Sequence, residues 1–156
     1  MWMAPFTLAV AARAAEPVFV PDFSPGSGGE FAVTVMLQSM VVEELVRDGF
    51  VVLTNDVVGK VVGPEAVATC AARPGCPGDV LPRVPSQIAV VVSIDKVGDE
   101  LVGNVALYES GSGSATETMF LPIVGGEEQK FASAISDAAG DLLERLGPSP
   151  DSVLLD

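Results

Sequence analysis

Two long stretches of the chain carry apolar residues at the three- and four-residue spacing of a helix that buries one face. Residues 30–48 place six apolar side chains on one side: Val33, Met36, Leu37, Met40, Val41 and Leu45. Residues 127–146 do the same with Phe131, Ile135, Ala138, Leu142 and Leu146. Gly49 follows the first stretch and Gly147-Pro148 follows the second, and both are signals that end helices. The pattern predicts two long amphipathic helices.

Five shorter apolar runs, bounded by turn-forming residues, are typical of β-strands. They cover residues 16–23, 50–53, 87–97, 101–108 and 116–124. The second run is continuously apolar and directly follows a predicted helix, which favours a buried strand in a helix-covered sheet. The third and fourth runs flank Gly98-Asp99, so we expect a hairpin that the fifth run extends into a meander.

The segments between these elements are less regular. Residues 57–62 fit neither pattern well, and Pro64 suits the first position of a short helix over residues 65–72. Four prolines between residues 74 and 85 exclude a long regular helix there. The predicted order is β-α-β-(α)-β-β-β-α, an α+β domain over residues 16–148 with helices packed on one face of a mixed β-sheet.

The first fifteen residues form a separate segment. The apolar run from Trp2 to Ala12 is too short to cross a membrane, which takes about 20 helical residues. It has the length of a secretory apolar region, and Ala12-Arg13-Ala14 supplies the small residues that signal peptidase requires, although no basic segment precedes the run. We expect residues 1–15 to be a signal peptide or its remnant; the alternative is a short apolar strand or helix of the mature fold.

The two cysteines, Cys70 and Cys76, are separated by five residues that include the turn-forming pair Pro74-Gly75. In an exported protein we expect them to form a disulfide that pins a local bend. The alternatives are a metal site and a redox pair. Two thiolates without a further Cys or His make a poor zinc site, and redox pairs more often have two intervening residues.

Composition excludes several classes of function. The chain has 8 Lys+Arg against 21 Asp+Glu, a net charge of −13, and no His. Such a charge repels nucleic-acid phosphates and anionic membranes. Without His there is no Ser-His-Asp or Cys-His catalysis and no His-ligated metal. The glycine-rich loop 24–29 lacks the spacing of phosphate-binding motifs. We therefore assign no catalytic residue, cofactor or metal ligand.

Carboxylates are the remaining candidates for acid–base chemistry. Asp95, Asp99 and Glu100 lie near the predicted hairpin turn, and Glu43 and Glu44 lie on the first long helix. A pair of them facing across a cleft would allow hydrolysis of glycosides. The three turn residues are also a candidate calcium site, but they lack the alternate spacing of an EF-hand. Acidic turn residues are usually solvated surface, so both remain alternatives.

Three pieces of the sequence resemble the amino-terminal domain of TolB and the related CsgG-like envelope proteins. They are the strand at 18–23 (VFVPDF), the helix Leu37-Val41-Leu45-Gly49 with the following 50–52 (FVV), and the strand at 86–92 (SQIAVVV). Exported members of that family often carry a Cys pair before the last of these strands. The chain departs from the family at Asp22, at Ser93 and in the proline-rich segment 74–85, and it has neither a propeller nor pore-forming hairpins.

The resemblance implies a non-catalytic, periplasmic or outer-membrane-associated module. Its expected partners are other envelope proteins of an outer-membrane, secretion or motility assembly, with no nucleic acid and no stable membrane span. The candidate contact surfaces are an exposed sheet edge and the apolar triplet Val153, Leu154 and Leu155 in the tail 149–156. The alternative function is a carboxylate-dependent hydrolase or a small-ligand-binding periplasmic protein. The sequence does not define the oligomeric state.

Overall fold

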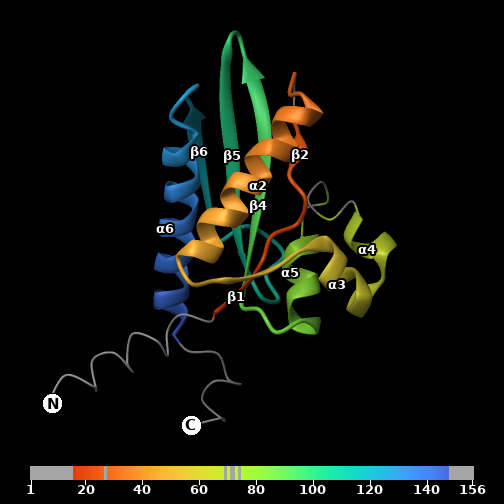
Figure 1. The fold of residues 1–156 in the computed structure, drawn as a ribbon. Coiled ribbons are helices and arrows are strands. Elements are labelled where there is room, and N and C mark those ends of the chain that lie inside the picture. Colours follow the sequence, from red (N-terminus) through yellow and green to blue (C-terminus); the bar gives the residue numbers. More distant parts are fainter. Residues whose placement is uncertain (1–15, 27, 69, 71–72, 74, 148–156) are drawn as a thin grey trace, which may run out of the picture.

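The computed structural model describes residues 16–26, 28–68, 70, 73 and 75–147 (Figure 1). Its elements, in chain order, are β1 (Pro17–Phe19), β2 (Ser24–Pro25), α2 (Phe31–Arg47), β3 (Val51–Leu53), α3 (Asn55–Val62), α4 (Pro64–Ala68), α5 (Cys76–Val80), the 3-10 helix η2 (Leu81–Arg83), β4 (Ile88–Val97), β5 (Glu100–Glu109), β6 (Glu117–Ile123) and α6 (Glu128–Leu146). The predicted signal peptide 1–15 and the tail triplet Val153, Leu154 and Leu155 lie outside the described residues.

The strands form one mixed sheet in the order β3-β1-β4-β5-β6, with β2 also paired to β4. Strand β1 is parallel to both β3 and β4, whereas β4, β5 and β6 form an antiparallel meander. The predicted α+β class, the mixed sheet and the hairpin that extends into a meander are confirmed. The predicted first strand, 16–23, is shorter in the structure, where β1 covers Pro17–Phe19. A separate short strand, β2, lies in the predicted loop 24–29, and β1 and β2 pair with successive parts of β4.

The two long helices cover one face of the sheet, as predicted (Figure 1). Alternate strand residues point to opposite faces, so Val18 and Val90 join the core beneath α2 and α6. Their neighbours Phe19 and Ala89 point the other way, into a second and smaller core formed with α3, α4 and α5. The sequence pattern places the helices on one face only, whereas α3, α4 and α5 pack on the other face. The pattern does not show this second layer because each short helix contributes only one or a few buried side chains.

Cys70 and Cys76 form a disulfide, with their Cα atoms 5.3 Å apart. Both side chains are buried in the second core, where they lie with Phe19, Val67 and the other apolar residues of α3, α4 and α5. The bridge closes a loop of sequence separation 6 and therefore fixes the bend between α4 and α5.

Two local expectations are wrong. Residues 50–53 are not a buried strand, because β3 is an edge strand of the sheet and Val51 is exposed. The crossover from β1 through α2 places β3 on the outer side of β1, and β4 takes the inner side. The buried face of α2 also differs from the predicted one, since Met36 is exposed and Thr34 and Glu44 are buried. The ambiguous residues 57–62 belong to a helix, α3.

No helix in the described part of the chain combines the length and the apolar character needed to cross a membrane. The longest one, α6, keeps an exposed acidic face, with Asp137, Asp141 and Glu144 on it.

Candidate functional site

The exposed sheet edge expected from the sequence is strand β6. It is the last strand in the order, and it pairs with β5 over seven residues, from Leu101 opposite Ile123 to Leu107 opposite Glu117. No described strand pairs with its other side. The opposite edge of the sheet, β3, is only three residues long. Unpaired backbone groups on an edge strand are a template for a partner strand, and β6 offers the longer one.

The outward direction of the β6 backbone follows from its proline. Proline has no N–H, so it is accommodated in a strand where its nitrogen points away from the ladder. Pro122 therefore indicates that residues at even positions, Phe120 and Thr118 among them, direct their backbone groups to the free edge. Pro122 itself offers no donor there, and residues 117–121 form the part of the edge that is available for pairing.

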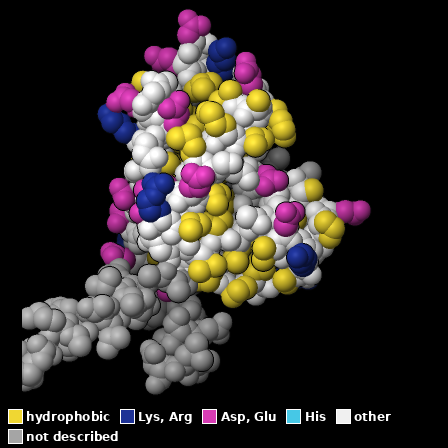
Figure 2. Space-filling view, in the orientation of Figure 1, with side chains coloured by type: hydrophobic (Ala, Val, Ile, Leu, Met, Phe, Trp, Pro, Cys, Tyr) yellow, Lys and Arg dark blue, Asp and Glu magenta, His cyan; other side chains and the backbone are white. Residues whose placement is uncertain are grey.

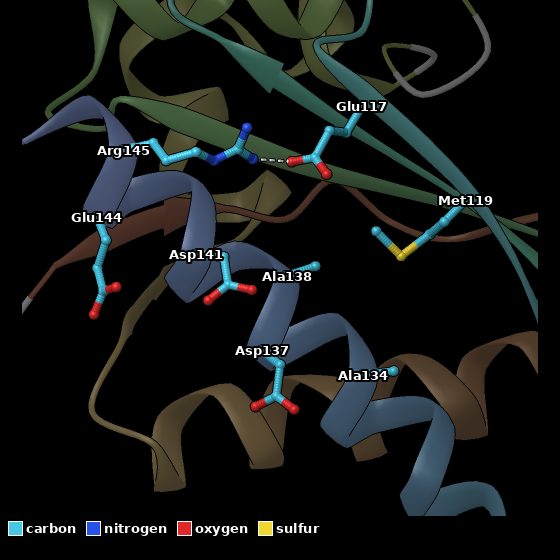
Figure 3. Close-up of a pocket in the computed structure, with 8 residues that line it drawn as sticks. All are labelled: Glu117, Met119, Ala134, Asp137, Ala138, Asp141, Glu144 and Arg145. Carbon is cyan, nitrogen blue, oxygen red and sulfur yellow. Dashed lines mark hydrogen bonds and ion pairs between the residues drawn. The ribbon is translucent and has the colours of Figure 1, made fainter.

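A groove runs between β6 and α6 (Figure 3). Its volume is about 910 Å³, and its lining residues are Glu117, Met119, Ala134, Asp137, Ala138, Asp141, Glu144 and Arg145. Glu117 and Met119 reach from the strand toward the helix, where Ala134 and Ala138 present only methyl groups (Figure 3). These small side chains leave open space between the strand and the helix.

The charge of the groove is predominantly negative. Four carboxylates line it against one guanidinium, and Arg145 donates a hydrogen bond to a Glu117 carboxylate oxygen at one end of the groove (Figure 3). Asp137 and Asp141 are exposed and lie one helical turn apart on α6, a spacing at which like charges repel each other. A Lys or Arg side chain between them would relieve this repulsion, so the groove favours a basic segment.

The carboxylates singled out in the sequence lie elsewhere. Asp99 and Glu100 are exposed at the turn between β4 and β5, while Asp95 lies near Gly26 in the loop after β2. Glu43 is exposed on the outer side of α2, and Glu44 is buried, accepting hydrogen bonds from Arg47 and Gln129. The carboxylates near the hairpin turn and those on α2 therefore do not come together, and none of them lines the groove. Among the described residues, no three Asp, Glu, Cys or His side chains are placed to hold a metal ion.

A second pocket is the candidate location for a small ligand, if the alternative function of ligand binding applies. It follows the carboxyl ends of β1 and β3, has a volume of about 400 Å³, and is lined by Asp22, Asn55, Asp56, Gly59, Lys60, Pro64, Val67 and Ala68. Asp22 is held there by Gln38, whose amide nitrogen donates a hydrogen bond to the Asp22 carboxylate at 3.0 Å. The carboxyl ends of parallel strands are a common place for ligands in such sheets.

The groove residues were missed in the sequence. The residue pattern places Asp137 in the predicted helix 127–146 and Glu117 in the predicted strand 116–124, and it gives neither of them a functional role. The sequence feature that could have indicated the groove is the pair of aspartates one turn apart, next to Ala134 and Ala138 at helical spacing. This pattern is typical of an acidic helix face with small side chains. That signal does not reveal which strand lies beside the helix.

The sequence matches no protein-family model and no curated protein. Among solved structures, the fold is similar to that of lipoprotein GNA1162 from Neisseria meningitidis, with a TM-score of 0.55. The two sequences are 14% identical, and the similarity covers 81% of this chain and 98% of that one. At this identity the likeness establishes a shared fold. It does not establish membership of the TolB or CsgG families, so that resemblance stays a prediction.

Proposed function

We propose that the protein is an exported, non-catalytic cell-envelope protein that docks onto other envelope proteins by accepting an extended, basic segment along β6. The observation that carries the proposal is the seven-residue strand edge beside an acidic groove. An added strand would form main-chain hydrogen bonds with the outward-facing backbone groups of Thr118 and Phe120, and its basic side chains would reach Asp137 and Asp141. This is the strand-addition mode of peptide recognition, in which the main chain gives affinity and side-chain sites give specificity.

Export and envelope location have separate support. A structural neighbour, GNA1162 from Neisseria meningitidis, is a lipoprotein. The buried disulfide between Cys70 and Cys76 is of the kind that persists in oxidising compartments such as the periplasm. Fractionation of the native cells tests the location: the protein is expected in the periplasmic or membrane fraction, and recovery in the cytoplasmic fraction alone would reject it.

We expect Thr118→Pro to weaken capture of partner proteins from envelope extracts by about tenfold, the equivalent of one or two lost backbone hydrogen bonds. Thr118 is exposed, and its N–H is assigned to the free edge, so the proline removes a donor from the partner and spares the β5 ladder. Thr118→Val is the matched control, because it keeps the N–H and the strand preference. The measurement is quantitative mass spectrometry of proteins captured by the full chain.

The charge of the groove is tested in the same capture. Asp137→Lys/Asp141→Lys should reduce the same partners by a similar factor, because charge complementarity across an interface is reversed. Asp99→Lys/Glu100→Lys is the control, since it makes the same change in net charge at the hairpin turn. Equal capture by wild type, Thr118→Pro and the Asp137/Asp141 variant would refute docking at β6.

A further inference from the structure

Helix α2 is apolar on both sides. Its inner side buries Leu37, Val41 and Leu45 in the main core. Its outer side carries Phe31, Val35, Met36 and Val46, which are 73%, 46%, 47% and 56% exposed. Figure 2 shows hydrophobic side chains gathered over this helix. The exposed polar residues Ser39 and Glu43 lie on the same outer side. Apolar side chains this exposed are normally covered, and these four lack a cover among the described residues.

Helix α6 shows that this exposure is specific to α2. Both helices lie on the same face of the sheet and contact each other. The outer side of α6 is polar, with Asp137, Asp141 and Glu144 exposed. The fold therefore does not require an apolar outer side on a helix in this layer, and contiguous exposed apolar patches mark interaction sites.

The exposed residues form a stripe along the helix, which we call the α2 stripe: Phe31, Val35, Met36 and Val46. Phe31, Val35 and Met36 lie in the first two turns, and Val46 lies three turns beyond Val35 on the same side, with the exposed Ser39 and Glu43 between them. From Phe31 to Val46 the stripe is about 22 Å long at about 1.5 Å per residue. A helix of about four turns has the same length, and helices pack with their apolar ridges along one another.

The charges around the stripe indicate the charge of the partner. Glu30, Glu43 and Asp48 are exposed at its start, middle and end. The one cation of the helix, Arg47, is paired with Glu44 at 2.6 Å. With a net charge of −13, a second copy of the chain and an anionic lipid surface are both repelled. A helix with an apolar side and flanking Lys or Arg residues would pack on the stripe and complement the charge of its acidic border.

We propose that the α2 stripe is a docking surface for an amphipathic, basic helix of a partner protein. This surface is separate from the β6 edge, and it takes a helix where β6 takes an extended segment. A protein with both would hold two partners, or two parts of one partner. The two proposals are tested independently, because Thr118 and Asp137 belong to neither the stripe nor its border. A negative result for β6 would therefore not contradict docking at the α2 stripe.

The probe is a synthetic 18-residue Leu/Lys amphipathic helical peptide, with a Leu/Glu peptide of the same apolar side as its counterpart. Fluorescence anisotropy with the full chain at physiological salt should show binding of the Leu/Lys peptide and at least tenfold weaker binding of the Leu/Glu peptide. Phe31→Ser/Val35→Ser should weaken Leu/Lys binding at least tenfold. The matched control is Val97→Ser/Val57→Ser, which changes two apolar residues that are 65% and 47% exposed and lie outside both α2 and β6, and it should leave binding unchanged.

The acidic border is tested by Glu30→Gln/Glu43→Gln, which should weaken binding of the Leu/Lys peptide about fivefold. The control is Glu65→Gln/Glu100→Gln, which makes the same change in net charge away from the stripe. All these side chains are exposed, so an unchanged thermal melt establishes that each variant is folded.

Three results would overturn the proposal. The first is equal peptide binding by wild type and Phe31→Ser/Val35→Ser. The second is self-association of the wild type in sedimentation experiments that the same substitutions abolish, which would assign the stripe to a second copy. The third is binding to phosphatidylcholine or phosphatidylglycerol vesicles that the substitutions abolish, which would assign it to lipid.

Discussion

Phe131→Ala is expected to lower the free energy of unfolding by about 3–5 kcal/mol, the range for loss of a buried aromatic ring. Phe131 is only 3% exposed and lies in the main core, in the first turns of α6. Its ring packs directly on the backbone of β5, where a Cβ added to Gly103 would come within 2.3 Å of the ring. The contact fixes α6 on the sheet, so we expect urea denaturation, followed by circular dichroism, to show the full loss.

The glycine side of this contact gives an independent test. Gly103→Ala should cost about 1–3 kcal/mol, because the new methyl group overlaps a ring that cannot move in a packed core. Gly103→Ala/Phe131→Leu should cost less than the sum of the two single changes, since the smaller side chain makes room for the methyl group. Phe120→Ala, at an exposed phenylalanine, should stay within about 0.5 kcal/mol of wild type. Strict additivity of the two core substitutions would contradict the contact.

Cys70→Ala/Cys76→Ala is expected to lower the free energy of unfolding by about 2 kcal/mol, because the open loop gains conformational freedom in the unfolded chain. The loop is short, with a sequence separation of 6, so the main core beneath α2 and α6 should persist. Urea denaturation of the oxidised wild type and of the variant measures the difference.

Reduced wild type is the control for the cysteine variant. Treatment with a phosphine reductant should produce a loss of similar size, because both changes open the same bridge. If the variant loses its far-ultraviolet spectrum altogether, the disulfide holds the whole fold together and the local role assigned to it is wrong. A loss below about 0.5 kcal/mol would show that α4 and α5 stay in place without it.

Most elements of the fold follow from residue spacing. Phe131, Ile135 and Leu142 were expected on the buried side of the last helix, and all three are buried. The hairpin at Gly98 was expected from two strand-like runs around a turn. These features depend on near neighbours in the chain, where a period of two or of about 3.6 residues assigns each side chain to a face.

The α2 face was harder to predict for a physical reason. A helix with apolar residues on both sides has no single preferred side, so the spacing of Val33, Met36 and Met40 did not identify which residues face the sheet. The position of α6 decides it, because Glu44 turns inward to accept a hydrogen bond from Gln129 on that helix. The same ambiguity leaves the apolar α2 stripe on the outside.

The sequence by itself determined the class of the protein: a mixed sheet with two long helices, a local cysteine pair, and an acidic chain without His. The tertiary structure decided where the surfaces lie. The strand order of the sheet leaves β6 as a free edge. The packing of α6 beside β6 makes Asp137 and Asp141 one wall of a groove. These are contacts between segments distant in the chain, and periodicity carries no information on which element is the neighbour of which.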